Sequence, residues 1–271
     1  MQKEHETAML LARLGDAVEK RQRGSVAVLP FLTPLQRRLT ERELKMRGEA
    51  DTAWFFGGYP TAERVCLFLL PDYLEDMRKT LADEIQDSYQ AVLAEDLTAA
   101  VCAVRILGSG YRKLTHRDYL GSILGLGLER DALGDIAPQN DFEAVVFCSA
   151  RMSDFLCENL RKVANDTVKC RPYTLDEGFT DGRQYQPVTD TVASARLDCV
   201  VAALTDLSRE DAQNAIRTGL VEVEFEEQTR TDLPLVPPLT LSVRGYGRYI
   251  LRSFDGETRR GRLRMRADRL I

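Results

Sequence analysis

The order of apolar runs and amphipathic segments between residues 99 and 173 constrains the fold of this chain most strongly. Two segments have apolar residues at helical spacing. The first follows Thr115, and the second spans residues 152–163. Four apolar runs are typical of strands: residues 99–107, 133–137, 142–148 and 168–173. The resulting order, β-α-β-β-α-β, predicts a ferredoxin-like arrangement. Nucleic-acid-binding modules, enzymes and metal-binding proteins all use this arrangement, so it does not decide function.

The flanking sequence predicts further units. Residues 1–48 have a helical pattern, with Thr33-Pro34 starting a second helix, and strand-like runs follow at residues 53–56 and 64–70. Residues 176–192 are rich in Asp, Gly, Gln, Pro and Thr, which indicates a linker. We therefore expect an α+β protein with four segments: a small N-terminal α/β unit (1–96), a ferredoxin-like, RRM-like domain (97–175), a linker (176–192) and a C-terminal domain (193–271).

Residue counts exclude several kinds of chemistry. The chain has two histidines and six cysteines, and no two cysteines form a CxxC pair. A zinc site needs clustered Cys and His ligands, which this sequence lacks, so we expect no metal. The sequence also places no nucleophile beside a base, so we expect no catalytic residues and no cofactor. The apolar runs are shorter than the roughly 20 residues that span a bilayer, and the charged N-terminus lacks the apolar core of a signal peptide. We expect a cytoplasmic protein without membrane contact.

Positive charge is concentrated at one end of an acidic chain. The net charge is −5, from 37 Lys+Arg and 42 Asp+Glu. Residues 244–271 nevertheless hold nine arginines and three acids, which predicts a local site for a polyanion such as nucleic acid. Strand alternation would place Arg262, Arg264 and Arg266 on one face, as a set of phosphate contacts that extends a neighbouring RNA site.

Residues 194–223 have the pattern helix, turn, helix, strand. Leu197, Val200, Val201 and Leu204 give the first helix an apolar stripe. The second helix begins at the N-cap Ser208, with Asp211 three residues later. Three polar residues of this helix recur every four positions and share its other face: Arg209, Gln213 and Arg217. An ordinary solvated face would show the same spacing.

A glycine-rich stretch follows the first strand of the middle domain. Residues 108–113 read GSGYRK and lack the spacing of a nucleotide-binding P-loop. A plain turn is the simpler interpretation, and a flexible loop whose Arg112 and Lys113 touch RNA phosphates is the alternative.

The C-terminal pattern resembles the S4-like RNA-binding domain. The residues that carry the resemblance are Arg196-Leu197-Asp198, Ser208-Arg209, Ala212, Ile216, Gly219 and the Val221-x-Val223 strand. The resemblance implies that Arg196, Arg209 and Arg217 contact structured RNA, and it makes Ser208 and Gln213 candidates of the same surface. The sequence departs from the family where Glu224-Phe225-Glu226-Glu227 replaces the usual Asn-Gly.

The wider chain resembles the YlmH family of bacterial RNA-binding proteins from the cell-division gene cluster. Four segments carry this likeness: KLTHRDYLGSILGLGLER (113–130), GDI (134–136), SVRGYGR (242–248) and GETRRGR (256–262). The resemblance implies a non-enzymatic factor that binds rRNA or tRNA, and we expect the protein to be a monomer. It further implies binding to large ribosomal subunits that carry stalled peptidyl-tRNA, in quality control or rescue.

Two other functions remain open from the sequence. Pseudouridine synthases often carry an S4-like domain and use an Arg-Leu-Asp motif followed by Thr-Ser-Gly, whereas Cys199-Val200-Val201 follows the motif here. A metal-dependent nuclease is a weaker alternative than a pseudouridine synthase, because the sequence shows no tight carboxylate cluster. A protein adaptor in cell division would show no salt-sensitive RNA binding.

Overall fold

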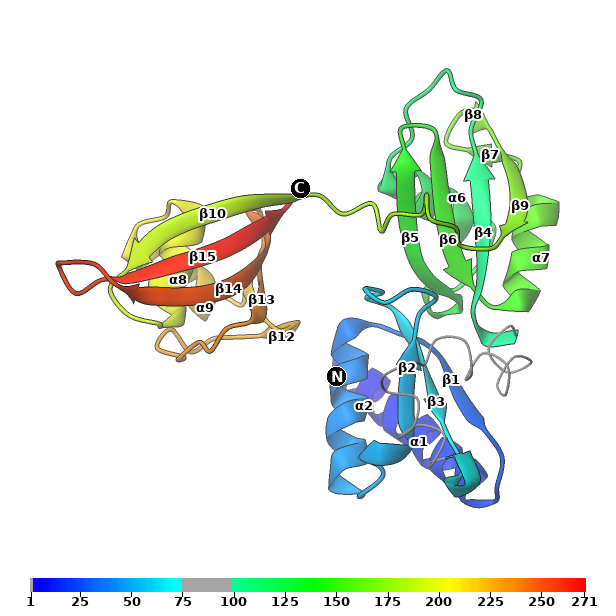
Figure 1. Ribbon diagram of the computed structural model, residues 1–271, viewed down its shortest axis with the longest axis horizontal. Coiled ribbons are helices and arrows are strands. Elements are labelled where there is room, and N and C mark those ends of the chain that lie inside the picture. The colour runs from blue at the N-terminus through cyan, green and yellow to red at the C-terminus, as the bar shows by residue number, and fades with distance from the viewer. Residues whose placement is uncertain (1, 75–98) are drawn as a thin grey trace. The chain divides into compact units, whose positions relative to one another are not determined.

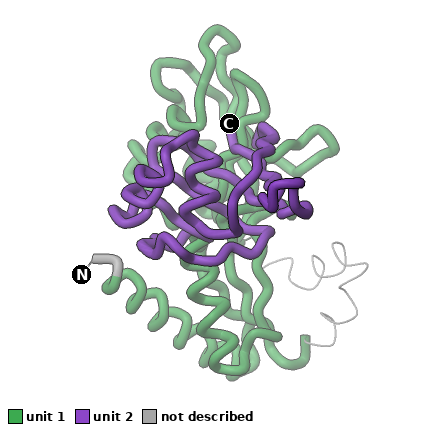
Figure 2. The backbone as a smooth tube through the Cα atoms, turned by 90° about the vertical axis from the view of Figure 1, so that its left-hand side faces the viewer, with its two compact units in different colours: residues 1–182 green, residues 183–271 purple. Residues whose placement is uncertain are grey.

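The computed structural model describes residues 2–74 and 99–271. Two compact units divide the chain, residues 1–182 and residues 183–271 (Figure 2). The boundary expected at residue 96 lies outside the described residues, and the described residues on both sides of it belong to the first unit.

The first unit begins with two helices against a three-stranded antiparallel sheet (Figure 1). The elements are α1 (Gln2–Gln22), β1 (Ala27–Leu32), α2 (Pro34–Met46), η1 (Ala50–Thr52), β2 (Ala53–Phe56), β3 (Val65–Leu69) and η2 (Asp72–Leu74), with strand order β1-β3-β2. Helix α2 starts at Thr33, as expected, because Thr33 and Gln36 form a reciprocal capping box. Leu14 and Leu44 pack against Leu67 and Leu69 of β3 to form the core.

The helical interpretation of residues 1–48 is wrong for β1. Residues 27–32 pair antiparallel with β3, from Ala27 opposite Leu69 to Leu32 opposite Val65. The apolar run of β1 is too short to distinguish a strand from a helix by its own periodicity. Its partner strand, almost forty residues further along the chain, decides the conformation.

The second part of this unit confirms the β-α-β-β-α-β order. The elements are β4 (Cys102–Leu107), α6 (His116–Leu124), η3 (Arg130–Ala132), β5 (Leu133–Asn140), β6 (Glu143–Cys148), α7 (Ala150–Asn159), β7 (Lys162–Val163), β8 (Asp166–Thr167) and β9 (Lys169–Tyr173). The sheet order is β5-β6-β4-β9. Helix α7 ends at Asn159 rather than residue 163, because Leu160 is extended and the β7–β8 hairpin follows.

The inner strands of the four-stranded sheet, β4 and β6, pack against other elements on both faces. Val104 and Ile106 of β4 pack against the helices α6 and α7, with Tyr119, Ile123 and Leu156. Ala103, Val145 and Phe147 point to the opposite face and share a core with Phe31, Tyr59 and Phe68 from the N-terminal strands and the β2–β3 connection. The two parts of the first unit therefore have a common apolar core.

Buried polar contacts reinforce this core. The Asp135 carboxylate accepts hydrogen bonds from the Tyr59 hydroxyl at 2.6 Å and from the backbone N–H groups of Glu63 and Arg64 at 2.8 and 3.1 Å. The Arg64 guanidinium donates to the carbonyls of Leu133 and Arg130 at 2.7 and 2.9 Å. Burial lowers the pKa of Arg64 to about 10, so this side chain remains charged at neutral pH.

We expect Arg64→Ala to lower the free energy of unfolding of the first unit by about 2 kcal/mol, because it leaves buried carbonyls without donors. Urea unfolding followed by the fluorescence of Trp54, the chain's single tryptophan, measures this change. Arg23→Ala, a change at a side chain that is 78% exposed, serves as the control. An Arg64→Ala unfolding curve that coincides with that of the unchanged protein would contradict the role of Arg64.

The second unit is a helical pair on one face of a six-stranded antiparallel sheet. Its elements are β10 (Tyr185–Val192), α8 (Leu197–Thr205), α9 (Arg209–Arg217), β11 (Val221–Val223), β12 (Glu226–Glu227), β13 (Leu239–Val243), β14 (Gly247–Glu257) and β15 (Leu263–Leu270), with strand order β10-β15-β14-β13-β11-β12. The expected helix-turn-helix-strand order is confirmed, and the Ser208 hydroxyl accepts from the Asp211 N–H as the N-cap of α9. Leu197, Val200 and Ile216 pack against Leu241 and Leu251 of the sheet.

The prediction of a linker over residues 176–192 is wrong for residues 185–192. These residues form β10, which pairs along its whole length with β15, from Tyr185 opposite Leu270 to Val192 opposite Leu263. Most β10 side chains are exposed, since it is an edge strand, and its polar composition therefore resembles that of a linker.

No helix within residues 2–74 or 99–271 is long and apolar enough to cross a membrane.

Candidate nucleic-acid interface

A buried carboxylate organises the polar end of the helical pair. Asp198, in the first turn of α8, is fully buried. Its Oδ1 accepts from Arg196 Nε at 3.1 Å and from the Cys199 N–H at 3.0 Å. Its Oδ2 accepts from Arg209 Nη2 at 3.1 Å and from Gln213 Nε2 at 2.9 Å. We call Arg196, Asp198, Arg209 and Gln213 the Asp198 cluster.

The Asp198 cluster joins residues that are not neighbours in the sequence. Arg196 is the N-cap of α8. The adjacent loop holds this end of the helix, because the Asp198 N–H donates to the Thr231 carbonyl and the Leu197 N–H donates to the Leu233 carbonyl. Arg209 and Gln213 project from successive turns of α9. The cluster therefore fixes two guanidinium groups and one amide at the place where α8 and α9 meet.

The electrostatics of the cluster favour an ionised carboxylate. Burial alone would raise the pKa of Asp198, but hydrogen bonds from Gln213, Arg196 and Arg209 outweigh it and lower the pKa to about 2. Asp198 in turn raises the pKa of Arg209. The guanidinium groups remain partly accessible, with 40% and 57% of the Arg196 and Arg209 side chains exposed. They can therefore contact a ligand while Asp198 holds their orientation.

The structure places the other helical candidates beside this cluster. Arg217 Nη2 donates to Gln213 Oε1 at 3.4 Å. Gln213 and Arg209 both donate to Asp198 Oδ2, so the three residues of the expected shared face are connected by hydrogen bonds. Ser208 uses its hydroxyl locally, accepting from the Asp211 N–H and donating to the Asp211 carboxylate. Ser208 therefore positions the start of α9.

Sequence reasoning missed two contributions. The sequence indicates Asp198 as a helix-face or salt-bridging residue, and its ion pairs with Arg196 and Arg209 confirm the salt-bridging interpretation. Its burial at the centre of the site was not predicted, and Arg230 was not considered. Arg230 lies next to Thr231, whose carbonyl accepts from Asp198, and its side chain is 66% exposed. The Arg-x-Asp spacing of residues 196–198 was the available signal, but only packing of α8 against α9 shows which residues share the carboxylate.

The arginines of β15 lie on one strand face, as alternation predicts. Arg262, Arg264 and Arg266 are exposed, whereas Met265 and Ala267 point into the core beneath the helices. Arg266 forms an ion pair with Asp255 at 2.5 Å, and Arg262 donates to the Thr191 hydroxyl at 3.0 Å. Beside Arg264 and Arg266 lies a pocket of about 360 Å³ that includes Thr189 and Asp190 of β10.

The expectation that this arginine face extends the helical site is wrong in its geometry. The helices α8 and α9 cover the face of the sheet that holds Met265, and the β15 arginines point away from that face. The sheet therefore separates the arginines from the helices. One ligand could reach both surfaces only by passing around an edge of the sheet.

The acidic turn after β11 keeps the backbone geometry of a tight hairpin. Glu224 and Phe225 both have positive φ, 52° and 67°, which a type I′ turn requires and which Asn-Gly adopts most easily. The Phe225 ring packs under the Arg248 guanidinium at 5.4 Å, and Glu224 accepts from the Thr240 N–H. These contacts hold a turn that lacks glycine.

Arg112 and Lys113, the candidates of the glycine-rich loop, lie in the first unit. The loop connects β4 to α6 and is exposed at both residues. Lys113 Nζ forms an ion pair with Asp141 at 2.5 Å. These candidates thus form a surface on a different unit from the Asp198 cluster.

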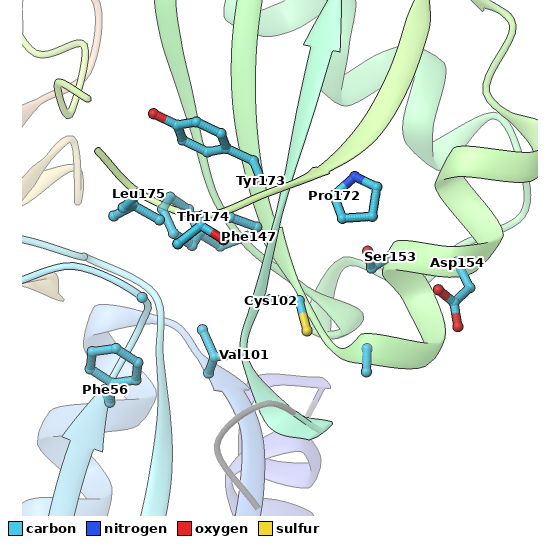
Figure 3. Close-up of a pocket in the computed structure, with 13 residues that line it drawn as sticks. Phe56, Val101, Cys102, Phe147, Ser153, Asp154, Pro172, Tyr173, Thr174 and Leu175 are labelled. Carbon is cyan, nitrogen blue, oxygen red and sulfur yellow. The ribbon is translucent and has the colours of Figure 1, made fainter. Parts of the chain in front are cut away.

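The first unit also contains a pocket of about 600 Å³ (Figure 3). Its walls include Phe56, Phe147 and Tyr173, with Cys102 and Asp154 as ionisable groups. Burial and the Asp154 charge raise the pKa of Cys102, which keeps this thiol protonated at neutral pH. No group of three metal-ligating side chains occurs within the part of the chain that the structure describes. With its pKa raised, the Cys102 thiol is not an activated nucleophile.

The fold and this interface define a mixed α+β protein with several antiparallel sheets and an arginine-lined helical surface. Residues 94–177 match the family model described as "Putative RNA-binding domain in YlmH". A relative from Bacillus subtilis (strain 168), the ribosome-associated protein quality control protein P2, is 27% identical over 223 residues, covering 82% of this chain and 80% of the relative. The solved cell division protein ylmH from Streptococcus pneumoniae aligns with a TM-score of 0.47 and 20% identity, over 62% of this chain and 92% of that one. Residues 94–177 therefore carry the domain that this YlmH family model describes, and the chain is similar to the Bacillus relative over most of its length.

Proposed function

We propose that this chain is a non-enzymatic RNA-binding protein that binds structured rRNA or tRNA on the large ribosomal subunit, in ribosome-associated quality control or rescue. The observation that carries this proposal is the Asp198 cluster, in which a fully buried carboxylate aligns the partly exposed Arg196 and Arg209. Guanidinium groups fixed in this way are suited to RNA phosphates, because their planar donors match phosphate oxygens and little rotamer entropy remains to be lost. The S4-like pattern of the sequence points to the same residues.

The comparisons support the ribosomal assignment at a coarser level. The family model concerns an RNA-binding domain, and the Bacillus relative is named for association with the ribosome in protein quality control. The finer assignment to the large subunit and to rRNA or tRNA is our proposal.

The burial of Asp198 also bears on the enzymatic alternative. A nucleophilic or basic aspartate must reach its substrate, whereas the oxygens of Asp198 are enclosed and accept hydrogen bonds from Arg196, Arg209, Gln213 and the Cys199 N–H. This arrangement favours a structural role over the catalytic role of the Arg-Leu-Asp motif in pseudouridine synthases. Formation of pseudouridine in rRNA or tRNA by the purified protein would overturn the proposal.

Co-sedimentation with purified large ribosomal subunits tests the proposed function. We expect the protein to pellet with the subunits at low salt and to be released as salt rises, because phosphate contacts displace bound cations. Small subunits at equal concentration are the control. A protein that stays in the supernatant at every salt concentration, or that pellets equally with both subunits, contradicts the proposal.

We expect the triple change of Arg262, Arg264 and Arg266 to Gln to weaken binding to large subunits more at low salt than at high salt. The melting temperature should hardly change, since surface ion pairs such as Arg266–Asp255 contribute little to stability. The sheet separates these arginines from the Asp198 cluster. When both sets of residues are changed in one variant, we therefore expect the change in log affinity to equal the sum of the two separate changes. Unchanged binding at low salt would remove β15 from the interface.

A further inference from the structure

A second exposed basic surface lies at one end of the four-stranded sheet in the first unit. The β4–α6 loop contributes Tyr111, Arg112 and Lys113, and β9 contributes Lys169 and Arg171. We call these five residues the loop-end patch. Lys169 pairs with Leu107, the last residue of β4 before the loop, and Arg171 pairs with Arg105. Figure 1 shows this loop at the end of the sheet where the β7–β8 hairpin also lies.

The acids around the loop-end patch already have partners. Glu143 forms an ion pair with Arg105, and Asp141 forms one with Lys113. Asp118 caps α6 with Thr115, and the buried Asp166 accepts from the Ser109 N–H and hydroxyl. Arg112, Lys169 and Arg171 are therefore the exposed charges that dominate this end of an otherwise acidic chain.

The loop is held in place on its inner side. The Gly108 N–H donates to the Phe142 carbonyl at 2.8 Å, and the Leu114 N–H donates to the Asp141 carbonyl at 2.7 Å. A Cβ at residue 108 would lie 2.8 Å from the Asp166 carboxylate, so glycine permits the close contact between loop and hairpin. Between these anchors, Tyr111 is 96% exposed. Both faces of this ring are therefore accessible to a ligand.

The usual base-stacking platform of such a sheet is not accessible. RNA-recognition modules stack bases on aromatic residues of their central strands. Here the aromatic residue of β6, Phe147, is 1% exposed and packs against Tyr59 with ring centroids 4.9 Å apart and against Phe179 at 5.8 Å. The Phe147 ring is therefore covered by the chain itself and is not available for stacking, whereas the loop end of the sheet is exposed.

We propose that the loop-end patch binds single-stranded RNA, with a base stacked on Tyr111 and backbone phosphates held by Arg112, Lys169 and Arg171. This inference deepens the proposed function and rests on it for the kind of ligand. Unpaired bases suit an isolated exposed ring, because every base has a face to stack and no groove must be entered. The patch is a second RNA site, separate from the Asp198 cluster.

The test uses the full chain and a fluorescein-labelled 12-nucleotide oligouridine, with binding followed by anisotropy across a salt series. We expect Tyr111→Ala to weaken binding about tenfold through the lost stack, and Tyr111→Phe to retain it. The Arg112→Gln/Lys169→Gln/Arg171→Gln variant should reduce the salt slope by about two units, since each single-strand phosphate contact contributes about 0.7. The matched control is Lys20→Gln/Arg23→Gln/Lys45→Gln. It removes three exposed charges, from α1, from the turn after α1 and from α2 in that order.

Melting curves of each variant establish that the first unit is folded. Equal affinity and slope in the patch variants and the matched control overturn the inference. So does loss of large-subunit co-sedimentation in the patch variants with unchanged oligouridine affinity, which would indicate a protein partner. Oligouridine binding that depends on Tyr111, together with no subunit co-sedimentation, would support the patch and contradict the proposed function.

Discussion

Asp198→Ala is expected to lower the free energy of unfolding of the second unit by about 3 kcal/mol, as removal of one partner from a buried ion pair does. The carboxylate is fully buried and holds Arg196, Arg209 and Gln213 together, so its loss leaves these donors without their common acceptor. Urea unfolding followed by circular dichroism measures the change. Asp232→Ala is the matched control: Asp232 is 56% exposed and pairs only with Arg230 among the described contacts, so its removal should cost less than about 1 kcal/mol.

The same variant gives a pH signature. The folded-state pKa of Asp198 is about 2, below its ordinary value of 3.8. A lowered folded-state pKa contributes stability that is present above pH 4 and is lost as the pH falls from about 4 to about 2. The difference in unfolding free energy between the unchanged protein and Asp198→Ala should therefore shrink over this window. A difference that is constant from pH 7 to pH 2 would contradict the ionised, hydrogen-bonded state of Asp198.

Changing both Arg196 and Arg209 to Ala is expected to weaken binding to large ribosomal subunits by about two to four orders of magnitude at low salt, since charge-assisted contacts contribute about 1.5–3 kcal/mol each. The slope of log affinity against log salt should fall by about two units, one for each lost phosphate contact. Co-sedimentation across a salt series measures both quantities. Arg13→Ala/Arg23→Ala, which removes two exposed arginines of the first unit, should leave the slope unchanged.

Folding and binding must be separated for the arginine variant. Arg196 and Arg209 are partly exposed, but their loss also leaves Asp198 with fewer donors, so some destabilisation is expected. Binding is therefore compared at a temperature where the melting curve shows the variant to be folded. An unchanged slope in the folded variant would mean that the guanidinium groups stabilise Asp198 and do not contact RNA.

Local patterns predicted many of the elements near the candidate sites. Thr115 and Asp118 form the capping box that starts α6, and Ser208 caps α9, because a cap depends on residues only three positions apart. The shared face of Arg209, Gln213 and Arg217 follows from helical spacing alone. The order of helices and strands in the middle of the chain followed from the order of apolar runs and amphipathic segments.

Distant partners decided the remaining features. Strands β1 and β10 lie in segments whose own composition indicated a helix and a linker, and each is a strand because β3 or β15 supplies its hydrogen bonds. Strand alternation predicted the common face of Arg262, Arg264 and Arg266, but the packing of α8 and α9 on Met265 determined that this face lies opposite the helices.

The sequence by itself determined which arginines lie on α9 and β15, because the helical and strand repeats are properties of the local backbone. Only the tertiary structure decided that Asp198 is the buried acceptor shared by Arg196, Arg209 and Gln213. The physical reason is that the environment of a carboxylate is set by the elements that pack around it. Here α8, α9 and the loop at Thr231 enclose Asp198, and no spacing within residues 196–213 specifies that arrangement.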